Sequence, residues 1–242
     1  RLALPAWSAH DIPSHVRGTS ISRGMSLAGY NGALASTGLT FDDVEVVEVG
    51  GTIENIGGSL TADGRPGREG LSKLWAIDAL VERRVDAVYV KGASALDGAR
   101  EAGVVIGIDL DKLPDPRFRV NNGTPRPITV HQDLIDNHFD YLVRFLATTL
   151  RAADWAASHV EDVRRILGDE TRGSAEAVSR AYGENFHQTL HPTLDAERLE
   201  LLRLQKKFLL IHGFLDADFD LADWVDPAPL AAAYELIKGS DL

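Results

Sequence analysis

Short apolar runs alternate with helical stretches along the first half of this sequence, and no other feature limits its fold as strongly. The runs fall at Leu2–Leu4, Val44–Val49, Asp86–Val90 and Val104–Ile108. Strands that alternate with helices build βαβ units, in which the strands pair in parallel through right-handed crossovers. The first half therefore predicts an α/β fold around a parallel sheet.

The stretches between these runs are expected to be helical. One helix should end near Gly38, a second should span Leu71–Arg84, and a third should span Ala93–Ala102. A polar, glycine-rich loop from Gly57 to Gly70 precedes the second of them. Each expected helix thus connects two expected strands, as a βαβ unit requires.

The second half changes character after the turn-rich segment Pro114–Pro127. One strand is expected at Ile128–His131, and helices are expected from there onward. Ser158 and Glu161 have the spacing of a capping box, which predicts a helix start near Ser158. The helix before it has an apolar face at helical spacing, formed by Phe139, Leu142, Val143, Leu146, Leu150, Ala153 and Ala157.

Two later helices have recognisable starts. Asp195 is a predicted N-cap, and Asp226-Pro227 opens a last short helix with proline in its first turn. Gly213 lies near the end of the helix that Asp195 begins. That helix carries an apolar stripe formed by Leu201, Leu204, Phe208, Ile211 and Leu215.

The composition excludes several classes of protein. A formal net charge of −11 argues against a nucleic acid or an anionic membrane as partner, although a local site for a small anion can oppose the overall sign. The 242 residues contain no cysteine, so this chain supplies no disulfide, thiolate metal ligand or cysteine nucleophile. No apolar run approaches the ~20 residues of a membrane span, so no direct membrane insertion is expected.

No metal site, cofactor or catalytic residue is assigned. His187 and His191 have the spacing of paired helical ligands, but no glutamate lies between them and Pro192 follows at once. A capped helix end is the preferred interpretation of this pair. The sequence also lacks a Walker loop, a G-x-G-x-x-G after a strand, and a G-x-S-x-G nucleophile elbow.

Ligands of open parallel sheets bind beyond the carboxyl ends of the strands, and this rule selects three turns. In the first turn, Ser8 and His10 offer donors at a helix N-terminus beside Ala9, and Trp7 offers an apolar wall. The structural alternative is that Ser8 only caps the helix and Trp7 belongs to the core.

The other two turns contain glycine next to a polar side chain. Gly51 lets the backbone approach a ligand closely, and Thr52 adds a hydroxyl. Lys91 and Gly92 follow an apolar run directly, where a lysine can pair with a carboxylate or sulfonate. A plain turn and a solvated or ion-paired lysine are the alternatives.

Several segments resemble ABC-transporter solute-binding proteins of the nitrate, sulfonate and taurine type. Arg1–Pro5 followed by Ser8–His10 is similar to the start of their second lobe, and Gly38–Val49, Leu80–Gly92 and Leu142–His159 are similar to later segments. The resemblance implies a periplasmic-binding-protein type II fold, the Venus flytrap, with C-terminal helices. It assigns residues 1–110 to an α/β second lobe and 111–242 to the return to the first lobe plus those helices.

The first residues suggest that part of the fold lies upstream. The chain starts with Arg1 directly on the run Leu2–Leu4, and mature proteins rarely begin inside a strand. We therefore expect the N-terminal part of the first lobe to be missing from this sequence.

A second resemblance is to hydroxybiphenyl sulfinate desulfinases, enzymes on the same fold. It rests on Tyr182–Leu210 and Asp223–Pro227. It implies that the nucleophilic cysteine, with its accompanying histidine and arginine, belongs to the upstream part. Two turns depart from the binding-protein pattern, because Trp7 replaces a small residue and Val90–Gly92 replaces an aromatic-acidic turn. These departures leave the identity of the ligand open.

Together these features predict a binding module rather than an enzyme. It would bind a small organic anion, such as a sulfonate, nitrate or a taurine-like or aromatic anion, in an interlobe cleft for ABC-type import. Its expected partner is an ABC-transporter permease, and its expected location is periplasmic or extracellular and lipid-anchored. The alternative is a cytoplasmic desulfinase-like hydrolase of an aromatic sulfinate, with its catalytic cysteine in an upstream segment.

Overall fold

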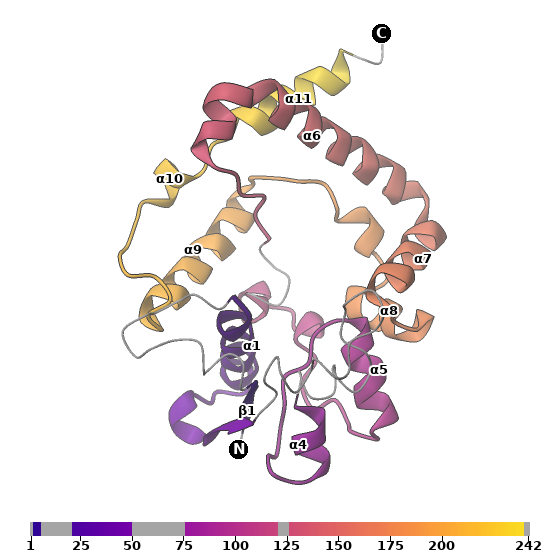
Figure 1. Cartoon of the computed structure of the whole chain (residues 1–242), viewed down its shortest axis with the longest axis vertical. Helices are drawn as coiled ribbons and strands as arrows, with labels where there is room; N and C mark the ends of the chain where they lie inside the picture. Colours follow the sequence, from indigo (N-terminus) through magenta and orange to yellow (C-terminus); the bar gives the residue numbers. More distant parts are fainter. Residues whose placement is uncertain (1, 6–20, 50–75, 121–125, 240–242) are drawn as a thin grey trace.

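The computed structural model describes residues 2–5, 21–49, 76–120 and 126–239, and Figure 1 shows their helices arranged as a ring. The α-helices span Ile21–Ser36 (α1), Ile77–Val81 (α4), Ala93–Glu101 (α5), Gln132–Ser158 (α6), Val160–Thr171 (α7), Ala175–Tyr182 (α8), Ala196–Ile211 (α9), Leu221–Trp224 (α10) and Ala228–Lys238 (α11). Short 3-10 helices span Phe41–Asp43 (η2), Leu110–Lys112 (η3), Pro116–Arg119 (η4) and Phe186–Gln188 (η5).

The described ranges contain one sheet, which has two strands, β1 (Leu2–Pro5) and β2 (Val46–Val49). The strands pair in parallel, with Leu2 opposite Val46. The connection between them contains α1, which ends two residues before Gly38, where a φ of 77° favours glycine. The parallel strand–helix–strand unit predicted at the start of the chain is therefore confirmed.

The predicted α/β class was wrong, and so was the Venus-flytrap architecture that the resemblance implied. Beyond β1 and β2, the described residues are mostly helical and form no further strand. Asp86–Val90 contains one isolated bridge residue, Ala87, whereas Val104–Ile108 and Ile128–His131 contain no strand residue.

These three segments have the composition of strands but form no ladder within the described part of the chain. A strand is stable only when its backbone N–H and C=O groups pair with a neighbouring strand, and side-chain composition does not supply that neighbour. Val105 is 90% exposed and Ile128 is 48% exposed, so their side chains are not covered as in a buried parallel sheet. The apolar pattern of these segments indicated extended backbone. It did not show whether a neighbouring strand would pair with them.

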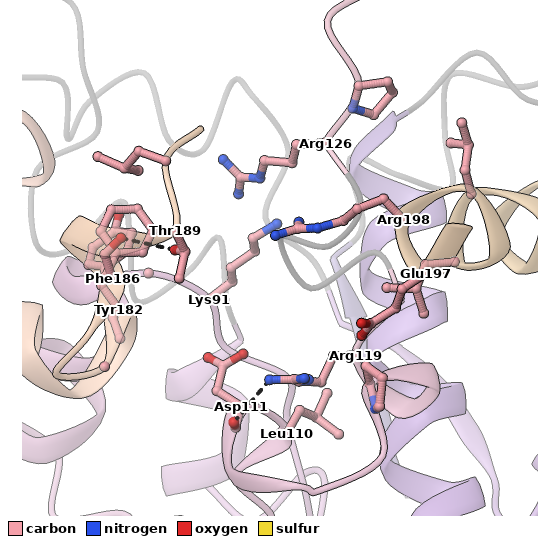
Figure 2. Close-up of a pocket in the computed structure, with 18 of the residues that line it drawn as sticks. Lys91, Leu110, Asp111, Arg119, Arg126, Tyr182, Phe186, Thr189, Glu197 and Arg198 are labelled. Atoms are coloured by element: carbon pink, nitrogen blue, oxygen red, sulfur yellow. Dashed lines mark hydrogen bonds between the residues drawn. The ribbon is translucent and has the colours of Figure 1, made fainter. Parts of the chain in front are cut away.

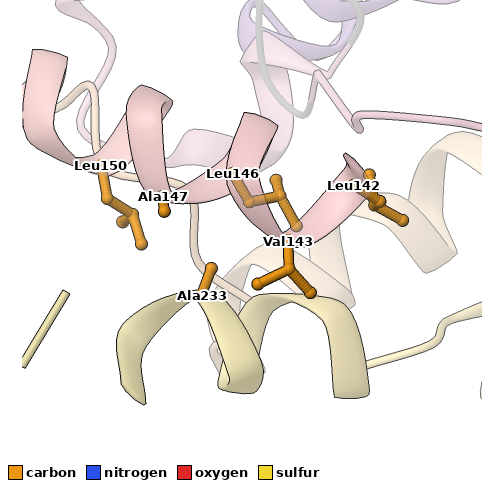
Figure 3. Close-up of a cluster of buried hydrophobic side chains, with 6 residues drawn as sticks. All are labelled: Leu142, Val143, Leu146, Ala147, Leu150 and Ala233. Carbon is orange, nitrogen blue, oxygen red and sulfur yellow. The ribbon is translucent and has the colours of Figure 1, made fainter. Parts of the chain in front are cut away.

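A hydrophobic core joins α6 to α11 (Figure 3). The fully buried Ala233 of α11 faces a row of buried apolar side chains on α6, formed by Leu142, Val143, Leu146, Ala147 and Leu150. The predicted face of α6 is confirmed as far as Ala153, but Ala156 is buried in place of the predicted Ala157. A step of three residues from Ala153 keeps the side chain on the same face of the helix.

An aspartate carboxylate accepts a backbone hydrogen bond at the start of two later helices. The Asp195 carboxylate accepts a hydrogen bond from the Arg198 N–H at 2.8 Å, and the Asp226 carboxylate accepts one from the Ala228 N–H at 2.9 Å. The predicted Asp195 cap is confirmed. Helix α11 begins directly after the predicted Asp226-Pro227, but Pro227 is its N-cap residue and the proline in its first turn is Pro229. The predicted apolar stripe of α9 was wrong at its end, because Ile211 is 69% exposed.

The predicted capping box at Ser158 was wrong. Ser158 is the last residue of α6, and its hydroxyl donates to the Trp155 carbonyl at 3.1 Å. Helix α7 begins at Val160 and has no side-chain cap. A serine hydroxyl that bonds to its own preceding turn is not free to cap the next helix.

Helix α5 packs closely against the junction of α7 and α8. The Asp97 carboxylate accepts hydrogen bonds from the Ser174 N–H at 2.6 Å and the Ser174 hydroxyl at 2.7 Å. Gly173 permits this approach, since a Cβ at that position would overlap the Ala93 side chain. The contact fixes α8 relative to the start of α5.

Helix α1 supports the segment that leads into α5. The buried Tyr30 hydroxyl accepts a hydrogen bond from the Tyr89 N–H at 2.9 Å, and the two ring centroids lie 5.9 Å apart. Gly32 lets η4 approach α1, because a Cβ at this position would overlap the Phe118 carbonyl oxygen. These contacts hold residues 86–92 and η4 against the same helix, α1.

Candidate functional site

One cavity, lined by residues from most of the described elements, lies between the parts of the ring. Its volume is about 2320 Å³, and its walls come from α1, residues 86–92, residues 104–112, residues 126–132, and the chain from the end of α8 into α9. Pockets for small molecules usually measure about 300–1,000 Å³. A small ligand would therefore occupy one region of this cavity rather than fill it.

Lys91 enters the cavity from the turn before α5. Gly92, with a φ of 85°, reverses the chain at the N-cap of α5 and leaves Lys91 half-buried in the cavity wall. Burial, followed by the positive charge of Arg126, lowers the pKa of Lys91 from its ordinary 10.5 to about 8. The negative charge of Asp111 opposes this shift. Lys91 therefore experiences charges of both signs, and Arg126 has the larger effect on its pKa.

Two arginines point toward the same region as Lys91 (Figure 2). Arg126 lies on the extended segment before α6, and Arg198 lies in the first turn of α9. The Asp195 cap fixes the backbone of that turn, since the Arg198 N–H donates to it. The three cations thus come from three separate parts of the chain.

Within the described part of the chain, Lys91, Arg126 and Arg198 have no carboxylate oxygen within 4.0 Å of their charged nitrogens. Two of them interact with a carboxylate at longer range, Lys91 with Asp111 and Arg198 with Asp195. We call these three residues the cationic cluster. Its arrangement favours a small anion, in a protein whose overall charge is negative.

A second polar group lies below the cationic cluster in Figure 2. Arg119 of η4 donates to the Asp111 carbonyl at 3.4 Å, and Glu197 of α9 lies on the same side. The Nε of Arg119 is buried and has no hydrogen-bond partner among the described residues. This part of the cavity therefore has charges of both signs.

An aromatic wall borders the cavity beside the cationic cluster. Tyr182 ends α8 and Phe186 begins η5, and their ring centroids lie 4.8 Å apart at 53°. The turn between them uses Gly183, with a φ of 74°, and the Thr189 hydroxyl donates to the Phe186 carbonyl at 2.9 Å. A tilted aromatic pair of this kind can hold a flat apolar group. The cavity thus combines an anion-binding region with an aromatic surface (Figure 2).

The structure brings together two of the predicted ligand-binding residues, Lys91 and Gly92, in the cavity wall. The other predicted residues lie outside the described ranges, and these are Trp7, Ser8, Ala9, His10, Gly51 and Thr52. Their role in binding stays a prediction, and so does that of Lys91 and Gly92.

Sequence reasoning did not identify Arg126, Arg198, Tyr182 or Phe186 as site residues. Arg126 belongs to a segment predicted as a turn, and Arg198 follows a predicted helix cap. The local sequence thus explains the presence of each arginine without a role in binding. Only the fold brings Arg126 and Arg198 to the same cavity as Lys91.

Two further properties of the described residues bear on the site. They contain no group of three or more histidine, aspartate or glutamate side chains that could hold a metal ion. None of the helices in these ranges has the length and apolar character needed to cross a membrane.

Comparison with known proteins gives one consistent result. No protein-family profile matches the chain. It is 27% identical over 171 residues to the 2'-hydroxybiphenyl-2-sulfinate desulfinases of Rhodococcus erythropolis and Rhodococcus qingshengii, an alignment that covers 62% of this chain and 47% of each relative. The chain therefore spans about half the length of the curated relatives that it matches.

Solved structures show the same likeness at the level of the fold. The desulfurization enzyme DSZB matches with a TM-score of 0.60 at 20% identity, covering 91% of this chain and 69% of that one. A cysteine-to-serine variant of DSZB in complex with biphenyl-2-sulfinic acid matches with a TM-score of 0.59 at 22% identity, covering 82% of this chain and 56% of that one. The described fold is thus similar to that of a desulfurization enzyme.

These findings correct the expected role in transport. The sequence and structure comparisons lead to desulfinases, so the predicted ABC-transporter binding protein, its permease partner and its periplasmic location were wrong. The segments that carried that resemblance are short, and they do not separate a binding protein from an enzyme. The desulfinase resemblance, which rested on the C-terminal half, agrees with the comparisons.

Proposed function

We propose that this chain binds an aromatic sulfinate in the cavity at Lys91 and contributes to a desulfinase reaction. The observation that carries the proposal is the similarity to 2'-hydroxybiphenyl-2-sulfinate desulfinases, at 27% identity over 171 residues. The cytoplasmic location attached to the desulfinase alternative becomes part of the same proposal.

The cavity supports this choice of ligand through its two unlike surfaces. The sulfinate group carries one negative charge and would face the cationic cluster. The aryl rings would lie against Tyr182 and Phe186, whose rings form a tilted pair. A ligand with a charged end and a flat apolar body uses both surfaces at once.

The reaction can be written with all atoms balanced. An aryl sulfinate and water give the arene and hydrogen sulfite: the carbon–sulfur bond breaks, the ring carbon gains a proton, and the sulfur gains an oxygen from water. The residues of the cavity would bind and orient the sulfinate and offset its charge. The chain contains no cysteine, so a thiolate that takes part in bond cleavage would have to come from an upstream segment, as the sequence resemblance implies.

The test measures binding and turnover separately. Isothermal titration calorimetry of the chain with 2'-hydroxybiphenyl-2-sulfinate should give saturable binding, and the protein at its native length should release sulfite from the same compound. Matched titrations with 2-hydroxybiphenyl, which lacks the anionic group, should give much weaker binding. No saturable binding of the sulfinate up to about 1 mM, equivalent to roughly 4 kcal/mol, would contradict the proposal.

The binding of the sulfinate should weaken above pH 8. Below that pH the ammonium of Lys91, whose pKa is about 8, carries its charge, and above it the neutral amine loses its attraction for the anion. Affinity should fall by up to about tenfold for each pH unit above 8. Lys91→Arg, which stays charged over this range, should remove most of this dependence. A wild-type affinity that stays constant from pH 7 to 10 would show that Lys91 does not face the anion.

A further inference from the structure

We infer that the Asp111 carboxylate accepts a hydrogen bond from a hydroxyl on the ligand, and so selects aryl sulfinates that carry a phenol next to the sulfinate. The inference rests on the proposed function for the sulfinate itself, and it assigns the choice between two sulfinates to one side chain. A carboxylate beside a site for anions needs an explanation, because it weakens the binding of any anion that offers it no donor.

The first argument is the place of Asp111 in the cavity. Asp111 belongs to η3 and lies in the cavity wall, below Lys91 in Figure 2. Its charge acts on the pKa of Lys91, so the two groups are electrostatic neighbours. The Asp109 carboxylate, two residues before it, is paired with the Lys112 ammonium at 3.3 Å. Asp111 is thus the carboxylate in reach of a ligand whose anionic group lies at Lys91.

The second argument is that the fold holds Asp111 in this place before a ligand binds. Leu110 anchors η3 in the core, and Arg119 of η4 donates to the Asp111 carbonyl at 3.4 Å. Partial burial, followed by the negative charge of Asp109, raises the pKa of the Asp111 carboxyl, whereas the charges of Arg119 and Lys91 oppose the rise. The carboxylate is therefore less well solvated than in water, and a donor on the ligand would replace part of that lost solvation.

The third argument is the chemistry of the proposed substrate, 2'-hydroxybiphenyl-2-sulfinate. Positions 2 and 2' both adjoin the bond between the rings, so the sulfinate and the hydroxyl can point the same way while the rings lie against Tyr182 and Phe186. A phenol has a pKa of about 10, so at pH 7 it keeps its proton and can donate. With the sulfinate at Lys91 and the hydroxyl at Asp111, a hydrogen bond offsets the repulsion between the two anions.

The consequence is a choice between ligands that differ by one oxygen. A site whose polar group pairs with a hydroxyl of the ligand rejects the analogue without it, because the polar group then loses that partner. Biphenyl-2-sulfinate is the matching analogue. The wild-type chain should bind 2'-hydroxybiphenyl-2-sulfinate about ten- to a hundredfold more tightly than biphenyl-2-sulfinate, as one charge-assisted hydrogen bond predicts.

The experiment titrates both sulfinates by calorimetry at pH 7 into the wild-type chain and Asp111→Leu. Leucine is similar in size but has no acceptor, so the variant should bind the two sulfinates within about twofold of each other. Because the variant also lacks the negative charge, it should bind biphenyl-2-sulfinate more tightly than the wild type does. A weaker hydroxylated ligand and a tighter analogue, in one variant, distinguish a ligand contact from a general loss of structure.

Two further variants serve as controls. Asp169→Leu removes the same charge from α7, outside the cavity, where Asp169 pairs with Arg165 at 3.5 Å, and it should keep the wild-type preference. Asp111→Asn replaces Asp111→Leu if leucine lowers the thermal midpoint. Its amide oxygen still accepts a hydrogen bond but carries no charge, so only part of the preference should remain.

The outcomes separate this inference from the proposed function. If the wild-type chain binds both sulfinates equally well, the role of Asp111 is wrong and the proposed function stands. If neither sulfinate binds, the proposed function is wrong and the inference falls with it. An unchanged preference in Asp111→Leu, or the full wild-type preference in Asp111→Asn, would also overturn the inference.

Discussion

Lys91→Met should weaken the binding of 2'-hydroxybiphenyl-2-sulfinate about ten- to a hundredfold at pH 7, as calorimetry would measure. A hydrogen bond to a charged group contributes about 1.5–3 kcal/mol, which corresponds to that range of affinity. Folding lowers the pKa of Lys91 from 10.5 to about 8, so the charged side chain opposes folding at pH 7. The variant should therefore keep or raise the free energy of unfolding.

The combination of weaker binding and unchanged or higher stability distinguishes a ligand contact from a structural role. Lys238→Met on α11 is the matched control, since Lys238 is exposed, pairs with Glu235 at 2.8 Å and lies outside the cavity. The control should bind the sulfinate like the wild type. If Lys91→Met bound the sulfinate as tightly as the control does, Lys91 would not belong to the binding site.

Leu150→Ala should lower the free energy of unfolding by about 2–5 kcal/mol, measured by urea denaturation. Leu150 is 1% exposed and belongs to the core that joins α6 to α11. Loss of its side chain removes apolar contact and leaves a cavity that the two helices only partly close. The cost would be a large fraction of the stability of a typical domain.

Ile211→Ala on α9 is the control for this variant. Ile211 is 69% exposed, so a similar loss of side-chain atoms should change the free energy of unfolding by less than about 0.5 kcal/mol. Similar losses of stability in the two variants would mean that α6 and α11 do not form the core described in Figure 3.

Local signals in the sequence predicted the helices well. The starts of α9 and α11 followed from Asp195 and Asp226, whose carboxylates bond to N–H groups two or three residues ahead. The face of α6 followed from its periodicity. Helix caps and apolar periodicity depend on residues that are neighbours along the chain. The sequence therefore contains all the information needed to predict them.

The sheet and the site depend on residues that are distant in the sequence. Val104–Ile108 has the composition of a strand, but the presence of a pairing partner cannot be read from that composition. Lys91 was predicted as a site residue from its position after an apolar run, whereas Arg126 and Arg198 gave no signal of their own. Their common cavity arises only when η4, α6 and α9 have taken their places around α1 and α5.

The cavity draws on nearly the whole length of the described chain, from Tyr30 to Leu230, and this has a consequence for folding. Contacts between distant residues form late, after the entropy of closing long loops has been lost, so no early intermediate should contain a complete site. Anion binding would then report on the fully folded state alone. A ligand at a concentration of a hundred times its Kd would raise the free energy of unfolding by about 2.7 kcal/mol, and this gain would appear chiefly as slower unfolding.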